Sequence, residues 1–310
     1  MKVFKISNIE DLKKDNKFRV AALGFFDGLH IAHKEIITRT VNKSKDSKLL
    51  STVITFNISP KEYFSKKEIE LLTPECRKKE ILDDLGVDEL YFLEFNEKLS
   101  KITKEEFIDK ILKVLNVKEV FCGYDYLFGY KGEGTPEYIS IYTNDEMKVN
   151  KISKIEFNDE KISTTLLKEK VIEGNFDDYI KLSGQPYTMV GTVVKGKQLG
   201  RTINFPTANL EPKYNYLLPK KLGVYITKVT VADKTFVGIT NIGKNPTVTN
   251  EDKIFIETHI LDFNEYIYGE EIKLDFYTFI RPEQKFNGID ELKVQLEEDK
   301  KIAEKFVFKN

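Results

Sequence analysis

The sequence predicts an α/β protein with two parts: an N-terminal doubly wound parallel sheet, and a C-terminal small antiparallel β-barrel that ends in a helix. In the first half of the 310 residues, short apolar runs alternate with helical patterns, as in a parallel sheet covered by helices on both faces. From about Gly184 the pattern changes to short strands separated by Gly, Pro and Asn, which is typical of antiparallel structure. We therefore expect two domains, at residues 1–183 and 184–310.

Four apolar runs in the first half predict the strands of the parallel sheet. They lie at residues 19–24, 50–56, 89–95 and 118–123. The segments between them carry apolar residues three and four positions apart, which is the spacing of one helical face. Residues 104–115 predict a helix whose buried stripe is Phe107, Ile108, Ile111, Leu112 and Leu115.

The second half predicts a hairpin, a half-buried strand and a final helix. Residues 225–231 and 235–240 flank a turn at 232–234, which indicates two paired strands. Around residues 272–277, apolar and polar side chains alternate, as on an antiparallel strand with one buried face. Residues 288–306 have helical spacing, and Asn287 with Asp290 suits the start of that helix.

The composition restricts the expected partners and location. Lys and Arg total 49 against 50 Asp and Glu, so the chain lacks the positive surplus that non-specific nucleic-acid binding requires. The two cysteines are far apart in the sequence, which argues against a disulfide framework and for a reducing compartment. No apolar stretch approaches 18 residues, and the first residues lack the apolar run of a signal peptide. We expect a cytoplasmic protein with no membrane or nucleic-acid partner, and the sequence identifies no protein partner.

A candidate site for phosphate chemistry follows the first strand of the α/β pattern. The turn Gly-Phe-Phe-Asp-Gly-Leu-His-Ile-Ala-His, residues 24–33, lies where open α/β sheets bind ligands. Gly24 and Gly28 permit tight backbone geometry, and the helix start offers N–H groups to an anion. His30 and His33 lie on one side of a helical turn and can stabilise charge that grows on a phosphate. Two alternatives are a metal site completed by Asp27 and ordinary helix residues.

These residues resemble the adenylyltransferase module of bacterial bifunctional riboflavin kinase/FAD synthetases, whose pattern is GxFDGxHxGH. The match continues at residues 123–129 (GYDYLFG), at Gly134, and at residues 162–168 (ISTTLLK). The resemblance implies a nucleotidyltransferase-like domain in which the phosphate of FMN attacks ATP and yields FAD and pyrophosphate. It implies catalytic roles for His30, His33 and Lys168, and ligand binding by Gly24, Asp27, Gly28, Asp125, Phe128, Ser163 and Thr165. From the residues alone, 163–165 are interpreted as a helix cap.

Three positions depart from the pattern of that module. Ala32 replaces its glycine, Lys168 replaces its arginine and so lacks a bidentate fork, and Ser59 stands where the family has histidine. These departures motivate an alternative hypothesis, a riboflavin kinase whose adenylyltransferase module is weak or inactive.

A second candidate site lies at residues 200–209, Gly-Arg-Thr-Ile-Asn-Phe-Pro-Thr-Ala-Asn. The oxygens of Thr207 and Asn209, two residues apart, can point to one side of an extended chain and suit Mg²⁺ together with ATP phosphates. The alternative from the residues alone is a turn that Thr and Asn side chains stabilise. The preceding residues 191–198 come close to a Walker A loop, but Gln198 lacks the hydroxyl that holds Mg²⁺.

Here the chain resembles the riboflavin kinase module of the same family, in which the PTAN motif contributes Mg²⁺ and nucleotide ligands. The resemblance implies that Glu257 is the catalytic base, that Thr207 and Asn209 hold Mg²⁺, and that Gly200, Arg201, Asn209 and Arg281 bind nucleotide or flavin. As alternatives, Glu257 is an outward-facing strand charge and Arg281 pairs with a surface carboxylate.

Together, the motifs of both modules predict a bifunctional enzyme of flavin cofactor synthesis. It would transfer phosphate from ATP to riboflavin, giving FMN, and then adenylylate FMN with a second ATP, giving FAD. Its small-molecule partners would be riboflavin, FMN, FAD and ATP, with Mg²⁺ as cofactor. A further alternative is a non-catalytic regulator that binds flavin or nucleotide.

Overall fold

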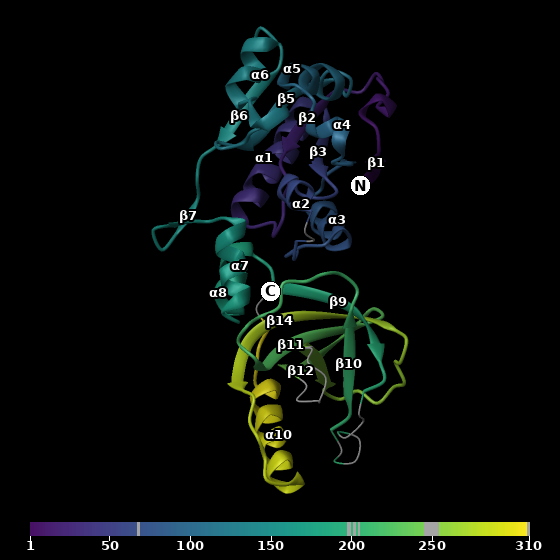
Figure 1. Cartoon of the computed structure of the whole chain (residues 1–310), viewed down its shortest axis with the longest axis vertical. Coiled ribbons are helices and arrows are strands. Elements are labelled where there is room, and N and C mark those ends of the chain that lie inside the picture. Colours follow the sequence, from purple (N-terminus) through teal and green to yellow (C-terminus); the bar gives the residue numbers. More distant parts are fainter. Residues whose placement is uncertain (67–68, 197–199, 201–202, 204, 245–253, 309–310) are drawn as a thin grey trace. The chain divides into compact units, whose positions relative to one another are not determined.

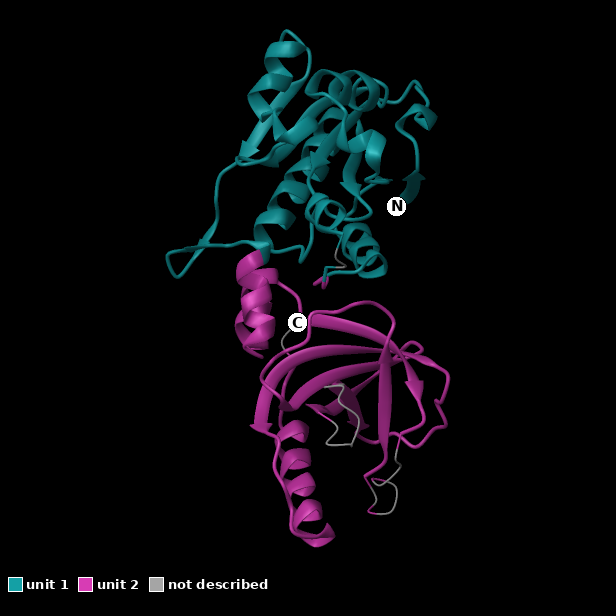
Figure 2. Ribbon diagram, viewed as in Figure 1, with its two compact units in different colours: residues 1–69, 73–164 teal, residues 70–72, 165–310 magenta. Residues whose placement is uncertain are grey.

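The computed structural model describes residues 1–66, 69–196, 200, 203, 205–244 and 254–308. Contacts divide the chain into two compact units (Figure 2). One contains Met1–Ile69 and Thr73–Thr164, and the other contains Glu70–Leu72 and Thr165–Asn310. This division falls earlier in the chain than the boundary at 183/184 that the sequence predicts. The two domain ranges therefore remain a prediction.

The N-terminal unit is built on a six-stranded parallel sheet in the order β1-β4-β3-β2-β5-β6 (Figure 1). Its strands are β1 (Lys2–Ile6), β2 (Arg19–Leu23), β3 (Leu50–Phe56), β4 (Glu89–Leu93), β5 (Val117–Gly123) and β6 (Lys148–Ile152), and all five neighbouring pairs are parallel. The four strands that the sequence predicts are β2, β3, β4 and β5. A short antiparallel pair, β7 (Glu156–Phe157) and β8 (Glu160–Lys161), follows the sheet.

Both faces of this sheet are covered, as the continuous apolar strands predict. Val20 and Ala22 of β2 face one core with residues of α1, whereas Ala21 and Leu23 face the other core with Phe107. The helices and helical turns of this unit are η1 (Ile9–Asp11), α1 (Ile31–Ser47), α2 (Pro60–Ser65), α3 (Glu75–Asp84), α4 (Glu97–Ser100), α5 (Lys104–Phe107), η3 (Tyr130–Gly132) and α6 (Pro136–Tyr142). The helix predicted at 104–115 is α5 followed by a π-helical segment, η2 (Ile108–Leu112), and its apolar stripe is buried.

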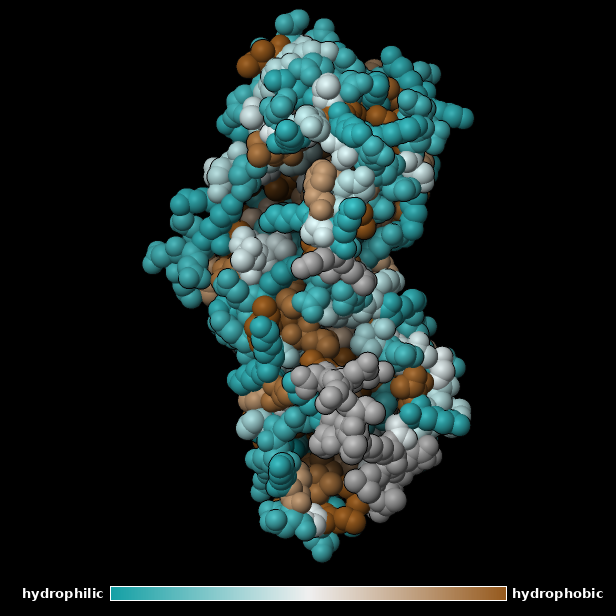
Figure 3. Space-filling view, viewed as in Figure 1, coloured by the Kyte–Doolittle hydropathy of each residue, from teal (hydrophilic) through white to brown (hydrophobic). Residues whose placement is uncertain are grey.

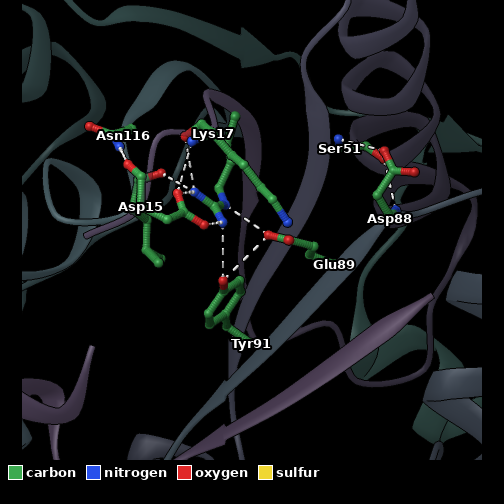
Figure 4. A network of polar contacts seen from close by, with 9 residues as sticks. Asp15, Lys17, Ser51, Asp88, Glu89, Tyr91 and Asn116 are labelled. Carbon is green, nitrogen blue, oxygen red and sulfur yellow. Dashed lines mark hydrogen bonds and ion pairs between the residues drawn. The ribbon is translucent and has the colours of Figure 1, made fainter. Parts of the chain in front are cut away.

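A buried polar network closes the amino end of the central strands (Figure 4). The Arg19 side chain of β2 is 2% exposed and reaches across β3 to Glu89 of β4, with 2.7 Å between Nε and Oε2. It also forms a bidentate pair with Asp15 and donates to the Leu115 carbonyl at 2.9 Å. Because every charge in this network is paired, its burial is tolerated. The network leaves the opposite, carboxyl end of the strands for ligands.

The C-terminal unit contains a closed barrel in the order β10-β13-β12-β11-β14-β9. Its antiparallel strands are β9 (Tyr187–Val194), β10 (Thr207–Pro212), β11 (Gly223–Val231), β12 (Lys234–Lys244), β13 (Ile254–Ile260) and β14 (Glu271–Pro282), and its helices are α7 (Thr164–Ile172), α8 (Phe176–Ser183) and α10 (Ile289–Glu304). The predicted fold class is confirmed. The predicted hairpin is present, with a shorter turn than expected because Lys234 already pairs with Val231. Gly288, not Asn287, occupies the N-cap of the final helix.

The barrel has a row of threonine hydroxyls inside, whereas its outer face carries an apolar cluster next to polar side chains. Inside, the hydroxyls of Thr227, Thr240 and Thr258 form a chain of hydrogen bonds of 2.8 and 3.0 Å, and all three residues are fully buried. Since successive side chains on a strand point to opposite faces, Asn241 and Glu257, which adjoin these threonines, point outward. The helix α10 covers this outer face, where Ala303 joins Val224, Ile226 and Ile239 in one apolar cluster.

On the face shown in Figure 3, hydrophilic residues predominate, and apolar residues gather in a few groups. Three exposed apolar residues belong to α10, namely Ile289, Val294 and Ile302. In the described part of the chain, no helix combines the length and apolar character needed to cross a membrane.

Candidate active sites

The first candidate site is the turn between β2 and α1. Phe26 and Leu29 adopt positive φ angles of 53° and 41°, and Gly28 has a φ of 77°. Such angles cost energy for residues with a side chain, so the surrounding contacts must hold this turn in place. At Gly24, an added Cβ would collide with the Phe26 ring, which explains why the turn requires glycine there.

The Phe25 carbonyl in this turn is fixed by two side chains. Thr55 Oγ1 of β3 donates to it at 2.9 Å, and Lys78 Nζ of α3 donates at 2.8 Å. Lys78 is 4% exposed, and its ammonium also lies 4.7 Å from the centre of the Phe25 ring. Burial lowers the pKa of Lys78 from 10.5 to about 8, against the nearby carboxylates of Asp27 and Glu75. Sequence reasoning assigned no role to either residue, although Thr55 opens the segment 55–60 that includes Ser59.

Asp27 is also held at both its side chain and its backbone. Its carboxylate accepts hydrogen bonds from the backbone N–H groups of Gly28, at 3.0 Å, and Thr73, at 3.1 Å. Its carbonyl accepts one from Thr164 Oγ1 at 3.1 Å. The third motif of this module is therefore joined to the first through Thr164, the residue between the predicted Ser163 and Thr165. These contacts give Asp27 a role in shaping the turn.

The two histidines lie against each other at the start of α1. Their rings stack with 3.6 Å between centroids and 17° between planes. Burial lowers the pKa of His30 to about 4, with a further contribution from Lys161, and burial with His30 nearby lowers the pKa of His33 well below its usual value. Both imidazoles are therefore neutral at pH 7.

The hydrogen bonds of His30 fix its tautomer. As the N-cap of α1, it accepts the backbone N–H of His33 at its Nδ1 atom, at 3.2 Å. A neutral ring that accepts at Nδ1 carries its proton on Nε2, so His30 has one N–H group to donate to a ligand. The Nδ1 atom of His33 is buried and has no hydrogen-bond partner among the described residues.

The other predicted residues of this module are placed differently. Asp125 forms an exposed ion pair with Lys161 at 2.6 Å. Phe128 is a buried core residue that packs on Phe107, with 4.9 Å between ring centroids. Ser59, at the family's histidine position, caps α2 by accepting the Glu62 N–H.

Thr165 and Lys168 belong to the C-terminal unit. Thr165 is exposed, and Lys168 Nζ donates to the Glu70 carbonyl of the same unit at 2.8 Å. The structure therefore brings Asp27, Gly28, His30 and His33 together at the turn and the first residues of α1. The Lys168 ammonium instead binds the Glu70 carbonyl.

The second candidate site is a row of side chains on the outer face of the barrel. In the strand register, Asn209 of β10 lies opposite Glu257 of β13, and Glu257 lies opposite Asn241 of β12. Asn241 lies opposite Val224 of β11, which lies opposite Arg281 of β14. Because residues directly opposite each other share a face, the row runs over five neighbouring strands. It brings together three residues that are far apart in the sequence and were predicted separately.

Thr207 lies beside this row, one pleat from Asn209. Its partner on β13 is His259, whose Nδ1 lies 2.8 Å from the Pro206 carbonyl and therefore donates to it. Burial lowers the pKa of His259, so this ring is neutral too. His259 thus fixes the backbone immediately before Thr207.

Two cavities adjoin Thr207 and His259. One of about 220 Å³ is lined by Glu257, Asn241 and Arg281 together with residues of α10. The other, of about 1240 Å³, is lined by residues of β10, β13 and the segment 262–268. Thr207 and His259 line both. The arrangement suits a reaction between two molecules that occupy neighbouring cavities.

Arg281 does not pair with a surface carboxylate, which was one alternative from the sequence. Its guanidinium forms a bidentate pair with Asp299 of α10, with Nε–Oδ1 and Nη2–Oδ2 distances of 2.9 and 2.8 Å. Asp299 is 0% exposed and also accepts a hydrogen bond from Gln295 at 3.2 Å. The pair connects β14 to α10 along the wall of the smaller cavity.

Two glycines permit close approaches near the PTAN motif. An added Cβ at Gly196 would collide with the Asn209 amide, and one at Gly200 would collide with the Phe205 carbonyl. Gly200 therefore has a steric role, and sequence reasoning missed Gly196. The predicted Arg201 lies outside the described residues.

Comparisons with known proteins relate each half of the chain to a family. Residues 12–166 match the family model described as FAD synthetase, and residues 183–307 match the one described as riboflavin kinase. The bifunctional riboflavin kinase/FMN adenylyltransferase of Listeria monocytogenes is 39% identical over 94% of this chain and 93% of that protein. The enzyme of the same name from Bacillus subtilis is 34% identical over 98% and 97%.

A solved structure is similar over the same extent. The structure described as a macrolide-efflux protein from Streptococcus pneumoniae has a TM-score of 0.90 and 30% sequence identity, and the match covers 99% of this chain and 100% of that one. The sequence relatives and the two family models confirm the predicted family and the predicted ATP-using transferase. The chain belongs to the bifunctional riboflavin kinase/FMN adenylyltransferase family, with one FAD synthetase domain and one riboflavin kinase domain.

Proposed function

We propose that the barrel unit carries out the kinase reaction at the row formed by Asn209, Glu257 and Arg281. The observation that supports this most strongly is the register that sets Glu257 between two asparagines, at the wall shared with the smaller cavity. In this proposal the smaller cavity holds riboflavin and the larger holds ATP. Residues 184–310 are the kinase module and residues 1–183 the adenylyltransferase module.

Glu257 acts as the base of the kinase reaction. Its carboxylate removes the proton of the terminal ribityl hydroxyl while that oxygen attacks the γ-phosphorus of ATP, and ADP leaves. Such proton transfer typically contributes about 10²–10⁴-fold to the rate. The remainder of the catalysis comes from positioning the two substrates and neutralising charge on the phosphates.

The oxygens beside Glu257 fit a magnesium ion. Thr207 and Asn209 alternate on one strand and so present a hydroxyl and an amide oxygen on one face, next to the Glu257 carboxylate. Hard oxygen ligands of this type, completed by phosphates and water, are those that Mg²⁺ prefers. When bound, the ion would neutralise phosphate charge. Because Gly196 has no side chain, the Asn209 amide fits against it. His259 fixes the backbone before Thr207.

At the first site, the phosphate of FMN attacks the α-phosphorus of ATP and pyrophosphate leaves. FMN's phosphate is already ionised at neutral pH, so this step requires no strong base. The neutral His30 donates its Nε2–H to a phosphate oxygen, and the start of α1 adds its N–H groups and positive dipole end. His33 supports the His30 ring by stacking and by its backbone N–H.

We also propose a cytoplasmic location. Both cysteines are free thiols, and burial raises the pKa of Cys122 to about 12, which keeps it protonated. Free cysteines are typical of a reducing compartment.

Two single-site variants test whether each reaction takes place at its own site. Glu257→Gln is expected to abolish FMN formation from riboflavin and to leave FAD formation from supplied FMN unchanged. His30→Ala is expected to abolish FAD formation from supplied FMN and to leave FMN formation from riboflavin unchanged. Flavins separated by chromatography give both rates, and titration with EDTA tests the requirement for Mg²⁺. If Glu257→Gln left the kinase rate unaltered, the assignment of the base would be wrong.

A further inference from the structure

Asn241 in β12 carries an unused hydrogen-bond acceptor. Its Oδ1 atom is buried and has no partner among the described residues. Buried side-chain oxygens of folded proteins nearly always accept a hydrogen bond, because leaving one unpaired costs stability. Asn241 also lines the smaller cavity of the barrel, together with Glu257 and Arg281. An unpaired acceptor in the wall of a substrate cavity points to a donor group on the substrate.

The position of Asn241 relative to Glu257 defines which part of a substrate it meets. The two residues are direct partners in the β12–β13 register and face the same side of the sheet. Neighbouring strands lie about 5 Å apart, so the backbones that carry the two side chains are one strand spacing apart, and both side chains line the same cavity. The group that donates to Asn241 is thus close in space to the hydroxyl that Glu257 deprotonates.

We propose that Asn241 binds the ribityl chain of the flavin, by accepting a hydrogen bond from a secondary hydroxyl next to the terminal hydroxyl. This inference rests on the proposed kinase role of Glu257. The only N–H donor of the flavin ring system lies at the end of the molecule remote from the ribityl terminus, farther than one strand spacing from the reacting group. The secondary hydroxyls of the chain are the donors within that distance.

This role makes Asn241 a specificity residue for the polyol chain. With riboflavin bound, Oδ1 gains the partner that it lacks in the free protein. With a flavin that has the terminal hydroxyl but no secondary hydroxyls, Oδ1 stays buried and unpaired. A site with a buried acceptor discriminates against analogues that lack the matching donor. The enzyme is therefore expected to prefer a polyhydroxylated chain over an alkyl chain of the same length.

The test compares two substrates and two variants in the full-length enzyme with ATP and Mg²⁺. The substrates are riboflavin and the analogue whose ribityl chain is replaced by 5-hydroxypentyl, which keeps the reacting hydroxyl. In Asn241→Leu, which preserves the side-chain shape, kcat/KM for riboflavin is expected to fall about tenfold, the loss typical of one hydrogen bond. For the hydroxypentyl analogue it is expected to change less than threefold. Asn241→Ser, which restores an oxygen, is expected to recover part of the preference for riboflavin.

The outcomes separate this inference from the kinase assignment. If the wild-type enzyme phosphorylates neither substrate, the proposed function of the barrel site is wrong. If the wild-type enzyme is active and Asn241→Leu lowers kcat/KM equally for both substrates, Asn241 only supports the structure and the inference is overturned. If Asn241→Leu is inactive with both substrates, Asn241→Ser is used for the comparison. If Asn241→Ser then shows no preference for riboflavin over the hydroxypentyl analogue, the inference is overturned as well. Unchanged kinetics with riboflavin in Asn241→Leu would overturn it directly.

Discussion

Replacing the buried Lys78 by methionine is expected to stabilise the N-terminal unit and to slow FAD formation. Methionine matches the length of the lysine side chain but has no charge. The ammonium of Lys78 lies near the rings of Phe25 and Phe92, 4% of the residue is exposed, and burial lowers its pKa from 10.5 to about 8 despite the nearby carboxylates of Asp27 and Glu75. A charge held at such a cost is expected to serve function, here by holding the Phe25 carbonyl of the phosphate-site turn.

The magnitude follows from the pKa and from the hydrogen bond. A fall from 10.5 to about 8 corresponds to about 3 kcal/mol, at about 1.4 kcal/mol for each pKa unit. The lost hydrogen bond to Phe25 offsets about 1 kcal/mol, and the carbonyl stays paired because Thr55 still donates to it. We expect Lys78→Met to raise the free energy of unfolding at pH 7 by about 2 kcal/mol.

The stability difference between the wild type and Lys78→Met is expected to change with pH in one direction. Below about pH 8, Lys78 is charged in both the folded and the unfolded chain, so the wild-type protein bears the full penalty. Between pH 8 and 10.5 the folded protein releases the proton and the unfolded chain keeps it, so wild-type stability rises relative to the variant. The advantage of Lys78→Met, about 2 kcal/mol at pH 7, is therefore expected to shrink over this range, to vanish at about pH 9.5, and to reverse by about 1 kcal/mol near pH 10.5, where only the lost hydrogen bond counts.

Urea unfolding followed by circular dichroism at pH 7, 9 and 10.5 measures the stability difference. Chromatography of FAD formed from supplied FMN measures the activity, which we expect to fall about tenfold. Lys79→Met is the matched control, because Lys79 lies on the same helix and pairs with Glu75 near the surface. Its stability is expected to change by less than about 0.5 kcal/mol. A Lys78→Met variant that is less stable at pH 7, with a difference that does not vary with pH, would refute the argument.

Three further predictions concern the histidines, the ion pair at α10 and the PTAN motif. Because burial lowers the pKa of all three histidines, none of their Hε1 signals in NMR spectra is expected to titrate with a midpoint at or above 6.5, and one such midpoint would contradict the assigned neutral rings. Asp299→Ala leaves the Arg281 guanidinium without its buried partner and is expected to cost about 3–5 kcal/mol in calorimetry, with FAD formation from FMN preserved; a loss under 1 kcal/mol would argue against a buried pair. Gly196→Ala places a methyl against the Asn209 amide and is expected to lower the kinase kcat at least tenfold; an unchanged kcat would show that Asn209 is not required in its present position.

The sequence was sufficient for the architecture because the architecture depends on local patterns. The buried strand Arg19–Leu23 and the stripe within residues 104–115 carry the required apolar spacing. The π-helical segment Ile108–Leu112 was not predictable, because it preserves the burial of the same residues while changing only the backbone hydrogen bonds. Nor was the Arg19–Glu89 pair, whose partners are 70 residues apart.

The candidate sites were predictable only as separate motifs. The motifs identify Glu257 and Asn209, but their alignment depends on the register of three strands, which no local pattern encodes. The segment 238–247 matches the pattern of the family, but the sequence assigns no role to Asn241, because its significance lies in a buried atom without a hydrogen-bond partner among the described residues. Lys78 was also missed, since a lysine on a helix ordinarily faces solvent.

The central claim is that one chain converts riboflavin first to FMN and then to FAD. The most direct measurement is a time course of purified full-length protein with riboflavin, ATP and Mg²⁺, with the flavins separated by chromatography. We predict that FMN appears first and is then consumed as FAD accumulates. FMN that accumulates without any FAD would contradict an active adenylyltransferase module and would implicate Ala32, Ser59 and Lys168. Riboflavin that remains unchanged would contradict the kinase site itself.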